Sequence, residues 1–324
     1  MNNQLKSRRD FLTVMGATLA TIPVGRYLAG CAADTAAAVN ELDAGALADA
    51  ATAADASVGA DATFALSDWA TGGTAVMAPL SSYPDPFTAF SGTTCTMQCN
   101  TTIGPCHADT AEKEDLSDGI DGLPVVLAFR VLDADCKPVA GALVEVWYTD
   151  SEGVYSDKST DMCNKATSVQ RTKSFSRGYR ITDADGKVFM KSTFPGWYSG
   201  RVIHYHVRVM LDGYVKHNSG DSSTNGNNTT ANGVIAITQF VFAEDLVSAI
   251  CTTEPLYKDR GTPDTKLAND NVMSGFSDKS PYILDVQKAT DKVMIASKTL
   301  IVRSDRNASI CGDSGGGNGG QPPR

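Results

Sequence analysis

The chain has 324 residues, of which 42% are hydrophobic and 20% charged, a composition typical of a globular protein with its own core. Its formal net charge of -9 excludes a protein whose main partner is nucleic acid, because binding to phosphates needs a basic surface. Beyond the N-terminus the sequence contains no apolar run long enough to cross a bilayer, which excludes a polytopic membrane protein.

Residues 1–31 are predicted to be a targeting segment rather than part of the fold. Arg8 and Arg9, followed by Phe11, stand in a stretch that resembles the twin-arginine export signal. The stretch that ends in Gly30 and Cys31 resembles the lipobox that is cleaved just before a lipid-modified cysteine. We therefore expect an exported protein that is anchored to the cell envelope, on its periplasmic or cell-surface side, through lipid on Cys31.

Two segments of biased composition flank the predicted domain. Alanine accounts for 14 of the 29 residues from 32 to 60, with few large apolar side chains, so residues 32–78 are predicted to be a linker. Residues 306–324 are rich in glycine and are predicted to be a flexible tail. The domain itself is expected at residues 79–305.

The eight cysteines predict disulfides in an exported protein. With Cys31 set aside for lipid, seven remain, which allows three pairs and one free thiol: Cys95, Cys99, Cys106, Cys136, Cys163, Cys251 and Cys311. The alternative is a zinc site formed by the three earliest of these cysteines and His107, although the paired spacing of common zinc fingers is lacking. Cys106 and His107 could also line a pocket, or be a disulfide cysteine and a surface histidine.

Between residues 122 and 302 the sequence predicts strands. Apolar and polar residues alternate with period two, between turn residues, in five runs: 124–131, 142–148, 201–211, 233–242 and 292–302. The first two are expected to be antiparallel neighbours. The turn at residues 183–186, followed by residues 187–193, is expected to close a hairpin. Short strands at this spacing indicate an all-β protein, an antiparallel β-sandwich with long loops.

His204 and His206 are the strongest candidates for a metal site. On a regular strand, residues i and i+2 project from the same face, so both imidazoles could bind one ion. The alternative is that the two histidines are polar residues on a solvated face.

Residues 194–206 resemble the metal-site segment of the intradiol ring-cleavage dioxygenases, the family of catechol 1,2-dioxygenase and protocatechuate 3,4-dioxygenase. The resemblance covers about residues 100 to 302 and continues, in the family's order, through residues 141–147, 153–156, 177–179, 182–186, 238–242 and 257–262. The chain departs from the family at residues 103–107, where a glutamate and aromatic residues are common, and this affects the expected substrate preference.

The resemblance implies a non-haem ferric ion, Fe(3+), held by Tyr155, Tyr198, His204 and His206. Phenolate oxygens are hard anionic donors that suit this hard cation, and neutral imidazoles complete the set. By the same resemblance Tyr198 would leave the metal as a catecholate binds and would accept a substrate proton. Arg201 would stabilise negative charge on the ring. A regular strand would turn Arg201 away from the histidines, so we expect the strand to begin after Arg201.

The sequence as a whole predicts an enzyme that uses O2 to split a catechol-type ring between its two hydroxyl-bearing carbons. Both oxygen atoms would enter the product, a muconate-type diacid. Two other hypotheses stay open: a non-catalytic surface β-sandwich lipoprotein that binds iron or catecholic ligands, and a structural lipoprotein with a vestigial site.

Overall fold

The computed structural model describes residues 66–88, 95, 97–157, 161–164, 173–214 and 233–303. The chain divides into two units, residues 1–59 and 60–324, and every described residue belongs to the second unit. The predicted signal at 1–31, most of the predicted linker and the predicted tail at 306–324 lie outside the described residues.

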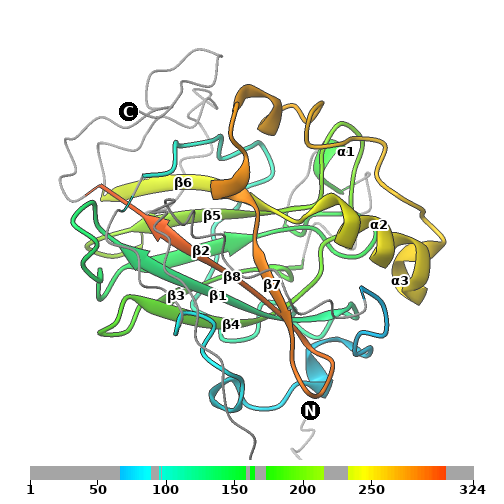
Figure 1. Ribbon diagram of the computed structural model, residues 1–324, viewed down its shortest axis with the longest axis horizontal. Helices are drawn as coiled ribbons and strands as arrows, with labels where there is room; N and C mark the ends of the chain where they lie inside the picture. The colour runs from blue at the N-terminus through cyan, green and yellow to red at the C-terminus, as the bar shows by residue number, and fades with distance from the viewer. Residues whose placement is uncertain are drawn as a thin grey trace, which may run out of the picture. The chain divides into compact units, whose positions relative to one another are not determined.

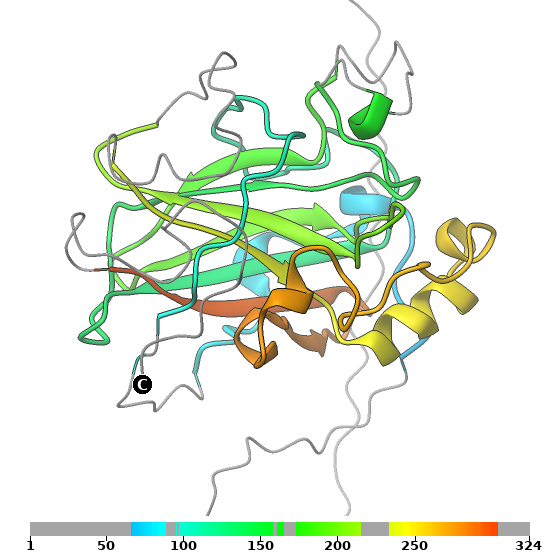
Figure 2. The ribbon, with the colours of Figure 1, turned by 90° about the horizontal axis from the view of Figure 1, so that it is seen from above.

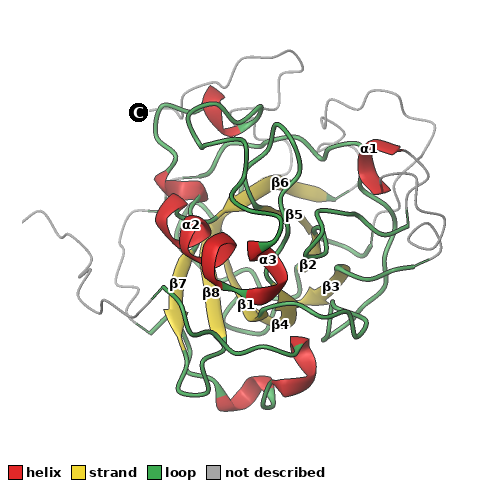
Figure 3. Cartoon of the chain, turned by 90° about the vertical axis from the view of Figure 1, so that its right-hand side faces the viewer, coloured by secondary structure: helices red, strands yellow, loops and turns green. Residues whose placement is uncertain are grey.

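Two sheets of four strands face each other, as the predicted β-sandwich requires (Figures 1 and 3). The first sheet contains, in spatial order, β4 (Lys187–Thr193), β1 (Pro124–Leu132), β8 (Met294–Ile301) and β7 (Asp285–Lys288). The second contains β3 (Arg177–Ile181), β2 (Leu143–Trp147), β5 (His204–Met210) and β6 (Val234–Val241). All pairs are antiparallel except β1 and β8, which run parallel, so the sandwich is not purely antiparallel.

The core lies between the two sheets. Alternate side chains of β1, such as Leu127 and Phe129, meet alternate side chains of the opposite sheet, such as Tyr205 and Phe240. The rings of Phe129 and Phe240 lie 5.5 Å apart. Each large apolar side chain that is fully buried here stabilises the fold by about 1.5–3 kcal/mol.

Two predicted strand pairings are wrong. The strands at 124–131 and 142–148 lie in opposite sheets, as β1 and β2, and are not neighbours. The turn at 183–186 does not close a hairpin, because it carries the chain from β3 in one sheet to β4 in the other. Alternation with period two shows which face of a strand is buried, but it does not distinguish a neighbour within the sheet from a partner across the core.

Helices gather at one end of the sandwich, where α2 (Glu244–Thr253) and α3 (Pro255–Lys258) follow β6 (Figures 1 and 2). Leu246, Val247 and Ile250 of α2 join the core. The other helical segments are short: α1 (Asp161–Asn164), η1 (Gly73–Val76), η2 (Leu80–Ser82), η4 (Met273–Gly275) and η5 (Ser280–Tyr282). Within the described ranges, none of the helices has both the length and the apolar character that crossing a membrane requires.

The folded part begins before residue 79, the boundary expected from the sequence. Trp69 is buried in the core, and its ring lies under the Lys288 ammonium at 4.3 Å. Gly73 donates its backbone N–H to the carbonyl of Gly122. A single tryptophan outside any periodic run gave little sequence signal for this attachment.

Residues 101–113, here called the strap, cross the outer face of the second sheet. At one end Thr101 donates its N–H to the carbonyl of Ile237 on β6, and at the other Lys113 donates to Tyr179 on β3. β6 and β3 are the two edges of this sheet, so the strap spans all four strands. Side chains of β2 and β5 that would otherwise face solvent are therefore buried beneath it.

The disulfides resolve the cysteine alternatives within the described residues. Cys95 is bonded to Cys136 and Cys106 to Cys163, Cys99 is also disulfide-bonded, and the buried Cys251 is a free thiol. The alternative zinc site is wrong, because all three of its cysteines are in disulfides.

Candidate metal centre

The two histidines lie on the outer face of β5, beneath the strap. Tyr205 and Val207 point into the core, so His204 and His206 share the opposite face, as their spacing predicts. Both imidazoles are buried, which rules out the solvated-face alternative. Gly104 of the strap lies so close that a Cβ there would be 3.1 Å from His206 Cε1, and Trp147 on β2 stacks against the His206 ring at 4.8 Å.

The two tyrosines lie on loops that meet backbone to backbone. Tyr155 follows β2 and Tyr198 follows β4. Gly196 donates its N–H to the carbonyl of Asp150 at 2.8 Å, and a Cβ on Gly196 would lie 2.3 Å from the carbonyl oxygen of Ser151. Only glycine allows so close an approach, and this contact brings the two phenols together.

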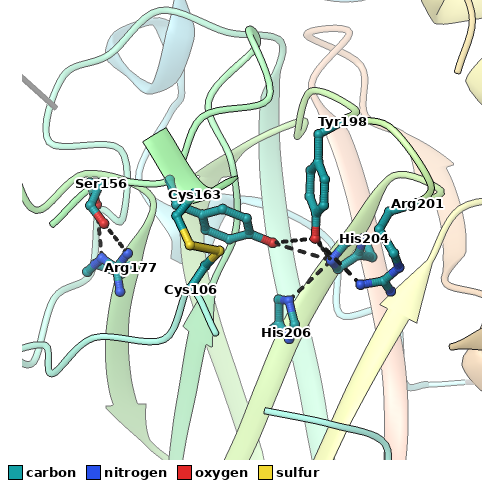
Figure 4. The surroundings of a disulfide bond; sticks show 9 residues. Cys106, Ser156, Cys163, Arg177, Tyr198, Arg201, His204 and His206 are labelled. Carbon is teal, nitrogen blue, oxygen red and sulfur yellow. Dashed lines mark hydrogen bonds between the residues drawn. A yellow bond between two sulfur atoms is a disulfide. The ribbon is translucent and has the colours of Figure 1, made fainter. Parts of the chain in front are cut away.

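The four predicted donors converge. Tyr155 Oη lies 3.4 Å from Tyr198 Oη and 3.3 Å from His204 Nε2. His204 Nε2 lies 3.4 Å from Tyr198 Oη and 3.2 Å from His206 Nε2. Figure 4 shows Tyr198, His204 and His206 pointing toward one another.

These distances suit a bound metal ion. Ligand atoms bound to one ion at about 2.0–2.1 Å lie about 3 to 3.5 Å from one another. In the described part of the chain, no three His, Cys, Asp or Glu side chains form a group that could hold a metal. Two donors of the present cluster are tyrosines, so it is a mixed set of two phenols and two imidazoles, which favours a hard, highly charged cation.

Hydrogen bonding and burial set the protonation of the donors. The carbonyl of Val202 can only accept, so His204 Nδ1 donates to it at 2.6 Å and leaves the Nε2 lone pair free for the cluster. Burial, together with the Arg201 charge, lowers the pKa of His204 to about 3, so the imidazole is neutral. Burial and the neighbouring Tyr198 raise the pKa of Tyr155 well above its usual value. A cation bound here would therefore displace the phenol proton of Tyr155.

Arg201 reaches the cluster from a turn. β5 begins at His204, and the N–H of Arg201 donates to the carbonyl of Tyr198, so the strand begins after Arg201 as predicted. Its Nη1 lies 3.5 Å from Tyr198 Oη, and its Nη2 donates to Gln239 Oε1 on β6. Burial lowers the pKa of Arg201, but Tyr198 and Asp270 outweigh burial and raise it, which keeps the guanidinium charged.

Asp270 holds Arg201 in place and was missed by the sequence analysis. Its carboxylate is completely buried and accepts from Arg201 Nε at 2.9 Å and from the backbone N–H of Val202 at 2.8 Å. Its other oxygen accepts from the N–H groups of Val272 and Met273. Asp270 is far from Arg201 in the sequence, in a loop without periodicity, so only the tertiary structure shows this pairing.

His107 is not the surface histidine that the sequence analysis allowed. It belongs to the strap and is buried against β2, with Nε2 3.1 Å from Glu145 Oε2 and its ring edge-on against Trp147 at 4.6 Å. Glu145 also accepts from Arg208 Nε at 2.7 Å and from the hydroxyl of Tyr214 at 2.7 Å. Burial raises the pKa of Glu145, but His107 and Arg208 more than offset this and lower it to about 2.

The Glu145 carboxylate should make the fold sensitive to acid. Because its pKa is lower in the folded protein than the ordinary 4.5, it contributes stability above pH 4.5 that is lost as the pH falls toward about 2. The contribution at neutral pH is on the order of 3 kcal/mol. Glu145→Gln should therefore reduce the free energy of unfolding at pH 7 and flatten its dependence between pH 4.5 and 2, measured by urea titration. Parallel pH curves for the two proteins would contradict this role.

Two phenols and two imidazoles meet at the outer face of this β-sandwich, which makes the protein a candidate non-haem metalloprotein. Comparison with known proteins indicates which kind of metalloprotein the chain resembles. Residues 99–217 match a family model described as Dioxygenase. Catechol 1,2-dioxygenase 2 of Acinetobacter lwoffii is 38% identical over 103 residues, which are 30% of this chain and 34% of that protein. 6-chlorohydroxyquinol 1,2-dioxygenase of Cupriavidus pinatubonensis is 31% identical over 129 residues, 35% of this chain and 46% of that protein.

The matched part of the chain is therefore similar to dioxygenases that include catechol and hydroxyquinol 1,2-dioxygenases. It spans less than half the length of both curated relatives. An intradiol ring-cleavage dioxygenase from Tetranychus urticae superposes with a TM-score of 0.52 at 21% identity, covering 64% of this chain and 95% of that structure. That similarity shows a shared fold.

Proposed function

We propose that this protein is a ferric-iron-dependent intradiol dioxygenase. It would cleave a catechol-type ring between the two hydroxyl-bearing carbons and place both atoms of O2 in a muconate-type diacid. The observation that carries the proposal is the convergence of Tyr155, Tyr198, His204 and His206, with the measured donor distances between 3.2 and 3.4 Å. The match of residues 99–217 to the dioxygenase family model, and the similarity to catechol 1,2-dioxygenase 2, support the reaction class.

The four donors suit ferric iron. Two phenolates supply negative charge to a hard cation and stabilise its ferric state, and the neutral imidazoles complete the set. When bound, ferric iron supplies the Lewis acidity that draws in catechol oxygens and the redox chemistry that makes the ring reactive toward O2. The protein contributes a buried, preorganised donor set.

Tyr198 is the donor on the substrate side. It is half-buried, whereas Tyr155, His204 and His206 are buried, so a catechol approaches past Tyr198. The Tyr198 phenolate oxygen would be placed to accept a proton from a substrate hydroxyl. Tyr198 would thus be both a residue that holds the metal and the group that takes up the substrate proton.

Arg201 stabilises the negative charge that develops on the ring. Its guanidinium lies beside Tyr198, where the substrate enters, and Asp270 and Gln239 hold it in one orientation. A charge that is fixed before the reaction stabilises the transition state without reorganisation. The role we assign to Arg201 is electrostatic, with no direct bond to the metal.

Oxygen consumption tests the proposed function. Iron-loaded protein is placed in an oxygen electrode with catechol, protocatechuate, hydroxyquinol or a chlorocatechol. The expected result is uptake of one O2 for each ring consumed with at least one of these substrates, and a ring-opened diacid. A red-brown protein that changes colour with catechols but consumes no oxygen would instead be a binding protein. A colourless protein that retains no iron would exclude both functions.

We also propose that the protein is exported and held at the cell envelope by lipid on Cys31. The twin arginines and the lipobox-like segment support this, in the order and spacing that both signals need. The membrane is then a partner through Cys31 only.

Separate substitutions in the export signal and in the lipobox-like segment test where the protein is located. Arg8→Lys with Arg9→Lys should leave the protein inside the cell, because the export machinery reads the arginine pair. Cys31→Ser should release the protein from membranes or leave its precursor uncleaved, because serine cannot take the lipid. Fractionation with immunoblotting and metabolic labelling with a fatty acid would show both effects. Lipid labelling of the Cys31→Ser variant equal to wild type would contradict the anchor.

A further inference from the structure

The disulfide between Cys106 and Cys163 joins two segments of the candidate metal centre. Cys106 lies in the strap, and Cys163 lies in α1, beyond Tyr155 on the loop that follows β2 (Figure 4). Both cysteines are buried, and the carbonyl of Cys163 accepts the backbone N–H of Tyr155 at 2.7 Å. The covalent bond therefore connects the strap to the residue that fixes the Tyr155 backbone.

Arg177 makes a second link between the same two segments. It is fully buried on β3 and donates from Nε to Ser156 Oγ at 2.9 Å and from Nη2 to the Ser156 carbonyl. Its Nη1 donates to the carbonyl of Ala108 in the strap at 3.2 Å. Ser156 is next to Tyr155 and Ala108 is close to Cys106, so the covalent and polar links converge on Tyr155.

Tyr155 needs such support because it is not on a strand. His204 and His206 are held by the hydrogen-bond ladder of β5 with β2 and β6. Tyr155 lies eight residues beyond the end of β2, on a loop, where no ladder fixes it. The strap also contacts the His206 ring through Gly104, so one segment touches the surroundings of both donors.

We propose that the Cys106–Cys163 disulfide is a positioning element that orders Tyr155 against the imidazoles before a cation binds. The expected effect of the disulfide on iron binding rests on the proposed function. Its expected effect on the order of Tyr155 does not depend on iron. Preordering lowers the entropy lost when the ion binds, so breaking the disulfide should weaken iron binding about 10- to 100-fold, the usual effect of removing an outer support.

The test compares two variants that each lack one disulfide. The first is Cys106→Ser with Cys163→Ser, and the matched control is Cys95→Ser with Cys136→Ser. The two bonds span 57 and 41 residues, so the loss of chain constraint is similar. The control bond fixes the turn between β1 and β2. The readouts are hydrogen exchange of the Tyr155 amide in metal-free protein and iron retained against a competing chelator.

Loss of Tyr155 amide protection by tenfold or more in the first variant, with 10- to 100-fold weaker iron binding, supports the proposal when the control keeps both properties. Breaking the same disulfide in a Tyr155→Phe protein should then weaken iron binding little further, because the disulfide acts through the donor that this variant already lacks. Equal Tyr155 amide protection and equal retained iron in the two disulfide variants would overturn the proposal. Fully additive effects of the disulfide variant and Tyr155→Phe on iron binding would overturn it as well.

Two further outcomes distinguish a failure of this inference from a failure of the proposed function. If wild-type protein retains no iron, the proposed function fails, while Tyr155 amide exchange still decides the positioning role. If the Cys106→Ser with Cys163→Ser variant does not fold, the disulfide of metal-free wild-type protein is instead reduced with a phosphine. The phosphine takes oxygen from water and becomes a phosphine oxide, and the two sulfur atoms take up the protons and become thiols. Unchanged Tyr155 exchange after cleavage of this bond would also overturn the proposal.

Discussion

His206→Ala should lose most of its bound iron, with the iron content per chain at least tenfold below wild type. His206 Nε2 lies 3.2 Å from His204 Nε2 on the same face of β5, and it is one of the two imidazole donors that we propose. Removing it leaves three donors and an unfilled position next to Trp147. Metal analysis of purified protein and the intensity of the tyrosinate absorption band measure the effect.

Val207→Ala is the matched control for His206→Ala. Val207 is the next residue on β5 but points into the core, so the variant loses packing without losing a donor. It should melt at a lower temperature and keep its iron. Equal iron contents in the two variants would contradict the ligand assignment of His206.

Arg201→Leu should keep its iron and lose turnover by about 10²- to 10³-fold, the usual effect of removing one preorganised charge-stabilising group. The variant also removes the cation that faces the buried Asp270 carboxylate, which should cost roughly 3–5 kcal/mol of stability. Turnover is therefore measured at a temperature where the variant is folded. Steady-state oxygen uptake, metal analysis and urea unfolding report the three quantities.

Arg201→Lys separates the two roles of this arginine. A lysine keeps a positive charge near Asp270, but it lacks the planar fork that reaches Asp270, Gln239 and Tyr198 at once. We expect most of the stability to return and only part of the rate. Normal turnover in Arg201→Leu would show that Arg201 plays no part in the reaction, and loss of iron would make its role structural.

The sequence predicted which candidate site residues lie together more completely than it predicted the pairing of the strands around them. The spacing of His204 and His206 places both on one face of a strand wherever that strand lies, so this prediction did not depend on the sheet order. Tyr155 and Tyr198 have no such local signal, and only the family resemblance of their segments pointed to them.

The features that sequence missed all depend on contacts between distant segments. Asp270 meets Arg201 only after the loop beyond α3 folds back onto the turn that precedes β5. His107 is buried because the ends of the strap pair with both edges of the second sheet and hold this residue against β2, and no sequence periodicity indicates such pairing. The pairing of β1 and β2 was wrong for a related reason, because adjacent runs of alternating residues can face each other across a core.

Cleavage of a catechol under isotopically labelled O2 tests the central claim most directly. Iron-loaded wild-type protein is given catechol and labelled O2, and the product is analysed by mass spectrometry. The account predicts a muconate-type diacid in which both labelled oxygen atoms are present, one in each new carboxylate. An unlabelled quinone, or a product opened next to the two hydroxyl-bearing carbons rather than between them, would contradict it.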